Sequence, residues 1–470
     1  MISLWKGSLA AALMLLIAAC GDEPTTRPAD FVNGPWTPTL VAGLTVTDGP
    51  SGLKPAGPAA QSQAENGDGG PADQLALAAL DDVQAYWIDA FPRAFDAEYR
   101  PIRRVVSYDS ATGGGQLCGV DTAGLVNAFY CSDDTVAWDR GVLLPDLQEQ
   151  FGELAVVTVL AHEVGHAVAS RLGDAGEGTA SIVKEQQADC YTGAFFRSVA
   201  EGDADRFEVS TGPGLNQVLA TLFAIRDSAG RSFDADGAHG NAFDRVTAFQ
   251  KGFGEGPPRC RAIDEAEIAD RITQQSSAQD GDADSQGADL GIGFDELADL
   301  ETTLREAFQP LNEGRIDVDA APCDGTEKTS PVSYCPGTDT VAVDLPELRR
   351  VGAAAQDGGF GDFAAFAEVA SRFSLSVQQA AGLSLEGLLA AQRTACLTGA
   401  WAATIQADQQ KALRLSPGDL DEAVAEMLTA ESLIASDVSG ASVPSGFARV
   451  KAFRDGFTAG IDNACAKQYR

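Results

Sequence analysis

The chain has 470 residues, of which 68 are Asp or Glu and 33 are Lys or Arg, so its formal net charge at pH 7 is −35. This charge argues against binding nucleic acid or anionic lipid through the protein surface, because both ligands are themselves negative. The length suffices for two domains of ordinary size, and histidine is scarce, with three in the whole chain.

The N-terminus predicts an exported, lipid-anchored protein. The apolar run over residues 9–19 is too short for a stable transmembrane helix and is typical of a signal peptide. It ends at Cys20 in a sequence that resembles the bacterial lipobox, whose cysteine is lipidated and becomes the mature N-terminus. Two acyl chains on Cys20 would anchor the protein at the extracytoplasmic face of the cell membrane, and the alternative is a secretory signal removed together with Cys20. We therefore expect a lipoprotein signal peptide over residues 1–20 and a flexible tether over residues 21–72, rich in Pro, Gly, Ala and Thr.

The most informative motif is His-Glu-Val-Gly-His at residues 162–166. In an α-helix, His162 and His166 lie on one face and can share a zinc ion, and Glu163 can reach a water bound to that ion. Residues 154–161 are uncharged and mostly apolar, as in a helix that crosses a domain core. The alternative, a surface helix with two incidental histidines, is disfavoured by the scarcity of histidine in this chain.

A third zinc ligand is expected in the next helical stretch, which begins at Glu185 after the glycine-rich residues 173–178. Glu185 and Asp189 are four residues apart and share a helix face. Glu185 can therefore bind the metal while Asp189 orients a ligand histidine from behind. Two histidines, one glutamate and an open fourth position form a catalytic zinc site. The alternative is a pair of solvated carboxylates, which are common in so acidic a chain.

These motifs resemble the bacterial neutral zinc metallopeptidases, a zincin family with a glutamate as third ligand. The similarity begins with HEVGHAV at residues 162–168 and the following ExQADC at residues 185–190. Flanking segments at residues 129–139 and 239–253 are similar to the family's preceding strand and C-terminal motif. Together they cover roughly residues 116–260 in the family's order, which is far more specific than HExxH alone.

The resemblance implies that His162, His166 and Glu185 bind one zinc ion in the first domain, with Glu163 as general base. A zinc-bound water has a pKa near neutrality, and Glu163 would take its proton as the water attacks a carbonyl group. The oxyanion that develops needs a further donor, and His239 in the C-terminal motif is the candidate catalytic residue for this role. Arg245 is the alternative donor.

The expected function is that of a membrane-anchored, extracytoplasmic zinc metallopeptidase with protein or peptide substrates. Two other functions stay open at this point. The same ligands would serve a zinc amidase or deacylase that acts on the cell envelope. A non-catalytic lipoprotein scaffold, whose second half binds a partner, is the other alternative.

Beyond Cys20, the cysteines form two sets of four at nearly equal spacings. They are Cys118, Cys131, Cys190 and Cys260, then Cys323, Cys335, Cys396 and Cys465. Local sequence repeats with them, as in CYTGA at residues 190–194 and CLTGA at residues 396–400. We infer a tandem duplication of one domain. In an exported chain these cysteines predict disulfides, with equal bonding expected in both copies. Cys118 and Cys131 flank a short segment, which Cys323 and Cys335 repeat, so we expect these two pairs to be bonded. The remaining expected bonds are Cys190–Cys260 and Cys396–Cys465.

The second copy has lost the zinc ligands. Matched from the cysteines, Ala391 stands in the place of Glu185, and no histidine follows His239. Glu368 is the counterpart of Glu163, which puts Ala367 and Ser371 where the two histidines were. The retained helical pattern suggests a structural, regulatory or binding role, and neutral decay is the alternative.

Apolar residues at helical spacing dominate both copies, with strand-like alternation at residues 103–106 and 135–138. We predict a helix-dominated α+β fold with two tandem zincin-like metallopeptidase domains, the second one degenerate. The first domain is expected over residues 73–272 and the second over residues 290–470. The Gln-, Ser-, Asp- and Gly-rich residues 273–289 are expected to be a linker.

Overall fold

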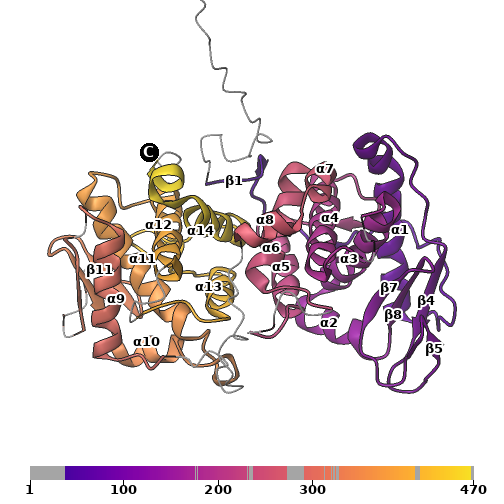
Figure 1. Cartoon of the computed structure of the whole chain (residues 1–470), viewed down its shortest axis with the longest axis horizontal. Helices are drawn as coiled ribbons and strands as arrows, with labels where there is room; N and C mark the ends of the chain where they lie inside the picture. The colour runs from indigo at the N-terminus through magenta and orange to yellow at the C-terminus, as the bar shows by residue number, and fades with distance from the viewer. Residues whose placement is uncertain are drawn as a thin grey trace, which may run out of the picture. The chain divides into compact units, whose positions relative to one another are not determined.

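The computed structural model (Figure 1) describes residues 38–466, apart from residues 175, 177, 230, 232–236, 272–289, 312, 319, 321–322, 324–327 and 408–412. The predicted signal peptide with Cys20 and the predicted linker therefore lie outside the described residues. We call residues 38–271 the first half and residues 290–466 the second half. The expectation of a helix-dominated α+β fold is confirmed.

The first half consists of short strands and longer helices in the following order. The elements are β1 (Leu40–Val41), β2 (Leu44–Thr45), β3 (Gly52–Leu53), α1 (Pro71–Phe95), β4 (Arg104–Tyr108), β5 (Gln116–Leu117), β6 (Val120–Asp121), β7 (Ala128–Cys131), β8 (Thr135–Asp139), α2 (Leu143–Phe151), α3 (Glu153–Leu172), α4 (Ser181–Glu201), β9 (Phe207–Glu208), α5 (Pro213–Ala224), α6 (Ala242–Glu255), α7 (Pro257–Arg261) and α8 (Glu265–Arg271).

The second half repeats much of this pattern in shorter form. Its elements are α9 (Phe294–Ala307), β10 (Arg315–Asp317), β11 (Val332–Cys335), β12 (Thr340–Val343), α10 (Leu345–Val351), the 3-10 turn η4 (Ala355–Asp357), α11 (Asp362–Ala380), α12 (Leu388–Ala407), α13 (Asp419–Met427), α14 (Gly446–Gly460) and the π-helical turn η5 (Ile461–Cys465).

Each half contains a three-stranded sheet with the same pairing. In the first half the order is β4-β8-β7, with β8 parallel to β4 and antiparallel to β7. In the second half it is β10-β12-β11, with β12 parallel to β10 and antiparallel to β11. All five residues of β8 are buried, as expected for a central strand with both faces covered. This topology leaves β7 as an edge strand of its sheet.

Helix α3 crosses the core of the first half. Its residues from Leu154 to Ala169 are buried except for the half-buried His166, and solvent reaches only Glu153 at its start and its last turn. The helix ends at Gly173, whose left-handed backbone (φ 77°) allows its N–H to bond back to the carbonyls of Ala169 and Ser170. Figure 1 shows α3 beside α1 and α4, so that α3 is surrounded by other elements.

Paired glycines bring two helices into close contact in each half. A Cβ on Gly193 of α4 would lie 2.0 Å from the carbonyl oxygen of Phe249 on α6, and one on Gly252 would lie 1.7 Å from that of Cys190. In the second half, a Cβ on Gly399 of α12 would lie 1.9 Å from the carbonyl oxygen of Phe453 on α14. The repeated Thr-Gly-Ala and Gly-Phe sequences are therefore contact points between helix backbones.

The structure contains four disulfides, in the pairs expected from the repeat. Cys118–Cys131 and Cys323–Cys335 close short loops with sequence separations of 13 and 12, next to β7 and β11. Cys190–Cys260 and Cys396–Cys465 close long loops with separations of 70 and 69. The long-range bonds tie α4 to α7 and α12 to η5, and each stabilises its half mainly by restricting the unfolded chain.

The expectation of a tether that reaches residue 72 is wrong for its C-terminal part. Strand β3 pairs with β9, the Thr47 N–H donates to Thr211 Oγ1 at 2.9 Å, and Val41 is buried. Helix α1 already begins at Pro71. Composition misled the prediction because a Pro- and Gly-rich segment without regular periodicity can still pack along a domain surface.

Residues of both halves belong to one compact unit. Helix α6 of the first half contacts α13 and α14 of the second, and the Gln250 Nε2–H donates to the Phe447 carbonyl at 2.9 Å. The predicted boundaries of two tandem domains stay a prediction. None of the helices in the described part of the chain combines the length and the apolarity needed to cross a membrane.

Candidate metal centre

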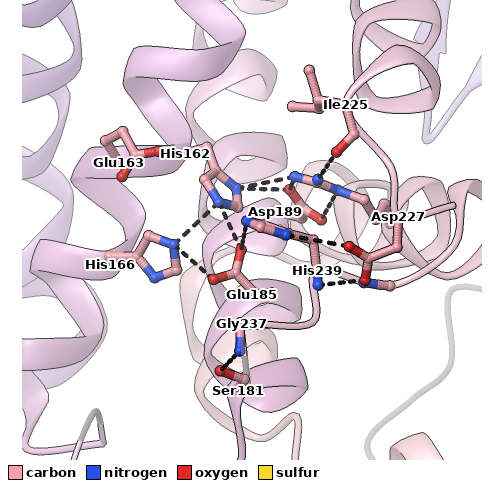
Figure 2. A network of polar contacts seen from close by, with 12 residues as sticks. His162, Glu163, His166, Ser181, Glu185, Asp189, Ile225, Asp227, Gly237 and His239 are labelled. Atoms are coloured by element: carbon pink, nitrogen blue, oxygen red, sulfur yellow. Dashed lines mark hydrogen bonds and ion pairs between the residues drawn. The ribbon is translucent and has the colours of Figure 1, made fainter. Parts of the chain in front are cut away.

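The two histidines of the HEVGH motif project from one face of α3, as their four-residue spacing predicts (Figure 2). Their ring centroids are 4.7 Å apart with an interplanar angle of 88°. His162 is buried and His166 is half-buried, so the pair lies at the floor of an opening and not on a free surface.

Helix α4 brings Glu185 to both histidines. Glu185 Oε2 lies 3.0 Å from His162 Nε2, and Glu185 Oε1 lies 3.4 Å from His166 Nε2. The two Nε2 atoms are 3.1 Å apart. The approach of α4 depends on Gly165, because a Cβ there would lie 2.8 Å from the Cα and the carbonyl oxygen of Ala188.

The three groups fit a zinc ion. Ligand atoms about 2.0–2.1 Å from zinc at tetrahedral angles lie about 3.3 Å from one another, which is close to the observed spacings. One ligand atom each from His162, His166 and Glu185 lies within 4.8 Å of the others. Two imidazole nitrogens and one carboxylate oxygen are also the donor set of catalytic zinc sites, which keep a fourth position open.

Behind His162, Asp189 and Arg245 form a buried ion pair. His162 Nδ1 lies 2.8 Å from Asp189 Oδ1, which leaves Nε2 directed at the other ligands. The Arg245 guanidinium donates to both oxygens of Asp189, at 2.9 and 2.8 Å. Burial works against a charge on Asp189, but Arg245 and His162 outweigh it and hold the pKa of this carboxyl below its usual value.

The charges around His162 also affect its own proton affinity. Burial lowers the pKa of the ring, but Asp189 and Glu185 outweigh this effect and raise it to about 10. Asp189 therefore stays an acceptor for the Nδ1–H. Asp189, which pairs with Arg245, contacts Nδ1 of this ring, while Glu185 and His166 contact Nε2.

The expectation that Arg245 is an alternative oxyanion donor finds no support in this geometry. Its side chain is 1% exposed, and its third nitrogen, Nη1, donates to the Ile225 carbonyl at 2.7 Å. With all three nitrogens engaged behind His162, Arg245 is placed to orient Asp189 and not to contact a substrate. The spacing of residues could not reveal this, because a helix of unknown orientation presents Arg245 to either side.

The side chain of Glu163 extends from α3 to the edge strand β7. Its Oε2 accepts a hydrogen bond from the Tyr130 N–H at 2.8 Å. Burial raises the pKa of Glu163, although the two neighbouring histidines oppose this shift. A carboxyl with a raised pKa next to the metal ligands is suited to accept a proton near neutral pH.

His239 reaches the site from the segment between α5 and α6. Its Nε2 is 3.9 Å from Glu185 Oε2 and its side chain is 46% exposed, so it faces the opening. Asp227 holds it: Asp227 Oδ2 accepts the N–H groups of His239 and Gly240 at 2.7 and 2.8 Å, and Oδ1 lies 3.4 Å from His239 Nδ1. Asp227 is absent from the predicted site, because no spacing in the sequence links it to His239.

A pocket of about 490 Å³ opens over these residues. Its walls combine the edge strand, the metal ligands and the segment before α6. They are Asn127, Ala128, Phe129, Tyr130, Ser132, Leu143, Val159, His162, Glu163, His166, Ser170, Lys184, Glu185, Ile225, His239 and Arg245. The candidate metal centre is therefore accessible from outside.

The corresponding region of the second half is filled by protein. The buried Arg372 of α11 donates to the carbonyls of Asp437, Leu433 and Ser436 at 2.8, 2.9 and 3.0 Å. Ser371, next to it, has its hydroxyl bonded to the carbonyl of Glu368 on the same helix. This half contains no histidine, so it lacks the imidazole ligands of a zinc site.

The buried HExxH helix, the glutamate on the next helix and the open pocket define the class, a candidate zinc-dependent hydrolase. Residues 39–263 match the model of the family described as "Putative neutral zinc metallopeptidase", which supports placing the first half in that family.

Two relatives have nearly the same sequence identity to this chain. An uncharacterized protein of Mycobacterium tuberculosis is 29% identical over 210 residues, which cover 40% of this chain and 69% of the relative. The uncharacterized protein YpfJ of Escherichia coli is 28% identical over 247 residues, 47% of this chain and 81% of the relative. No solved structure matches the chain significantly. Each of these matches covers less than half of this chain.

Proposed function

We propose that the chain is a zinc-dependent metallopeptidase that hydrolyses peptide bonds of protein or peptide substrates. The observation that carries this proposal is the convergence of His162, His166 and Glu185 within ligand distance at the floor of an open pocket. A structural zinc site would instead be closed by four protein ligands.

A peptide substrate is favoured by the edge strand in the pocket wall. Strand β7 forms one side of the pocket, and the Tyr130 N–H on its outer edge points toward Glu163. An extended peptide can pair with such an edge through main-chain hydrogen bonds, which would lay its carbonyl groups along the metal centre. This favours peptidase activity over the alternative of an amidase or deacylase.

The residues of the site have separable roles in the proposed reaction. A zinc ion, when bound, supplies an activated water and polarises the carbonyl group that is attacked. Glu163 accepts the proton of the water and passes it to the nitrogen of the leaving amine. His239, held by Asp227, is placed to donate to the oxygen on which negative charge develops. Asp189 and Arg245 keep His162 in the orientation that exposes Nε2 to the metal.

The test uses the full mature chain with a broad peptide library. We expect one tightly bound zinc ion per chain and zinc-dependent cleavage. Glu163→Gln should keep the zinc ion and lower the rate by roughly 10²–10⁴-fold, because it removes the base and leaves the ligands. Glu185→Ala should weaken zinc binding itself.

The control is Glu149→Gln, which changes an exposed glutamate outside the pocket and should leave both zinc and activity unchanged. Full activity of Glu163→Gln would end the assignment of the general base, and two tightly bound zinc ions would contradict the single site. A zinc-loaded chain that spares every peptide but removes acyl groups from amines would favour the deacylase alternative.

We also propose that the enzyme acts outside the cytoplasmic membrane of a bacterium, anchored by lipid on Cys20. The support is the signal-like sequence before Cys20 together with the disulfides, which persist in oxidising compartments.

A further inference from the structure

One segment of the first half supplies three of the groups that surround the metal ligands. It runs from Ile225, after α5, to Arg245 in the first turn of α6, and it carries Asp227, His239 and Arg245. Arg245 bonds both Asp189 and the Ile225 carbonyl, so the beginning and the end of the segment are tied together. Any displacement of the segment's described residues 225–229 and 237–245 would move the groups that orient His162 and His239.

The second half contacts both ends of this segment through one side chain. Asp421 on α13 accepts the Phe243 N–H at 3.1 Å through Oδ1. Its Oδ2 lies 3.1 Å from Nε of Arg226, the residue before Asp227. The first N–H groups of a helix lack partners within the helix, and a carboxylate there also interacts favourably with the helix dipole. Asp421 therefore bonds both the first turn of α6, at Phe243, and Arg226 near the beginning of the segment.

The surroundings of Asp421 make these bonds strong. Its side chain is 6% exposed, so it is screened little by solvent. Next to it, the Phe243 ring packs against Phe457 and Phe453 of α14, with centroid distances of 5.6 and 6.3 Å. Removal of the carboxylate would leave a buried N–H and a partly buried guanidinium without this acceptor, a costly change in an apolar environment.

We propose that Asp421 of the second half is a positioning residue of the metal centre, and that the site of the first half is complete only with the second half in place. The contacts run from Asp421 to Phe243, two residues before Arg245, and then through Asp189 to His162. A second line runs from Asp421 to Arg226 and its neighbour Asp227, which holds His239. Asp421 lies outside the matched residues 39–263.

This inference rests on the proposed function only in that the ligands bind zinc. It assigns the second half a structural part in the site, in place of regulation, substrate capture or neutral decay. If the contacts between the halves only held them together, changing any one of them would lower stability and leave zinc affinity unchanged.

The experiment compares Asp421→Ala and Asp421→Asn with Arg454→Met in the full chain. Arg454 also bridges the halves, since its Nη1 donates to Gln250 Oε1 at 2.6 Å, but Gln250 lies beyond the segment that carries the site groups. Zinc affinity is measured by competition with a chromogenic chelator, and backbone order by hydrogen–deuterium exchange of peptides over residues 225–245. Thermal unfolding is recorded for each variant.

We expect Asp421→Ala to weaken zinc binding about tenfold and to speed exchange in residues 225–245. Asp421→Asn should lie between Asp421→Ala and the wild type, because its amide oxygen can still accept the Phe243 N–H while the ion pair with Arg226 is lost. Arg454→Met should keep the zinc affinity and the exchange of this segment. In a peptidase assay, Asp421→Asn should lower kcat more than it changes KM.

Equal zinc affinity and exchange in the Asp421 variants and Arg454→Met would overturn the proposal, even if all of them unfold earlier than the wild type. If Asp421→Ala does not fold, Asp421→Asn decides on the same readouts. If the wild type cleaves no peptide, the proposed function fails, but zinc affinity and exchange still test the role of Asp421.

Discussion

At the scale of single residues, burial and partners decide which charged side chains can take part in chemistry. Arg245 and His239 belong to the same motif, yet one is completely enclosed and the other is 46% exposed. The enclosed arginine can only orient Asp189, and the exposed histidine can reach a substrate. Glu368 of the second half, at the position matched to Glu163, is also buried. Burial therefore decides its charge state as well.

Arg245→Lys should weaken zinc binding by roughly tenfold. A lysine offers a single charged nitrogen and cannot bond both oxygens of Asp189 and the Ile225 carbonyl in the planar arrangement that the guanidinium provides. The free energy of unfolding should fall by about 1–3 kcal/mol. Chelator competition and denaturant unfolding measure the two effects.

The matched control is Arg261→Lys, which alters an ion pair with Asp174 whose arginine is 46% exposed. An exposed pair contributes little, so this variant should unfold within about 1 kcal/mol of the wild type and bind zinc equally well. Unchanged zinc affinity in Arg245→Lys would show that Asp189 needs no partner to orient His162.

Glu368→Gln should make the protein more stable at pH 8 and leave its stability almost unchanged at pH 4. Burial, and then the nearby carboxyl of Glu426, hold the pKa of Glu368 well above 4.5, its ordinary value. The folded protein therefore keeps a proton that the unfolded chain loses, and the free energy of unfolding falls as the pH rises above 4.5. Glutamine removes this loss.

The gain at pH 8 should be on the order of 1–3 kcal/mol, because Glu368 Oε2 is buried without a hydrogen-bond partner among the described residues. Thermal unfolding across this pH range provides the measurement, with the exposed Glu386→Gln as a control that should follow the wild type. Destabilisation of Glu368→Gln at pH 8 would mean that the carboxylate has a partner in solution.

At the scale of secondary structure, the metal centre depends on the distance between α3 and α4. Each helix supplies part of the ligand set, and the two helix backbones come into close contact at Gly165 and Ala188. Interiors are packed densely enough that one added methyl group is felt. The disulfide Cys190–Cys260 and the glycine contact between α4 and α6 hold α4 from its other side.

Gly165→Ala should lower zinc affinity and cost about 1–3 kcal/mol of stability, as overpacking does in a rigid core. The new Cβ would lie 2.8 Å from the Ala188 backbone, which cannot rotate away, so α4 and Glu185 must move. Metal titration and thermal unfolding measure the effect.

Gly254→Ala is the matched control, since it also replaces a glycine within a helix. Its Cβ would meet the Ala42 side chain at 3.8 Å, an ordinary contact, and alanine should stabilise the helix by up to about 1 kcal/mol. Wild-type zinc affinity in Gly165→Ala would show that α4 is held less tightly than the structure indicates.

At the scale of the whole molecule, the first half with the candidate metal centre and the second half pack against each other. The described residues of both halves belong to one compact unit, and α6 lies at their contact. A net charge of −35 favours solubility through mutual repulsion, which is compatible with the proposed export and lipid anchor.

Cys20→Ala should abolish incorporation of labelled palmitate in a bacterial host. The variant should then either be released from the membrane or keep its signal peptide uncleaved. The reason is that the proposed anchor attaches its lipid to this thiol, and two acyl chains are needed for stable anchoring. Metabolic labelling followed by membrane fractionation measures it, with Cys118→Ala as a cysteine control that should still be lipidated. Unchanged membrane association without label would point to a different anchor.

The sequence by itself predicted the helix-dominated class and the cysteine pairs, which the structure confirms, and the candidate ligands and general base, which the structure brings together. These depend on local spacing: four residues bring His162 and His166 to one face of a helix, and a repeated spacing reveals equivalent cysteines. Tertiary structure alone decided the rest. The partnership of Asp227 with His239, the enclosed position of Arg245 and the contact of Asp421 with α6 join residues that no periodicity relates. The extent of the tether was misjudged for the same reason, since the packing of an irregular segment depends on the surface that it meets and not on its own composition.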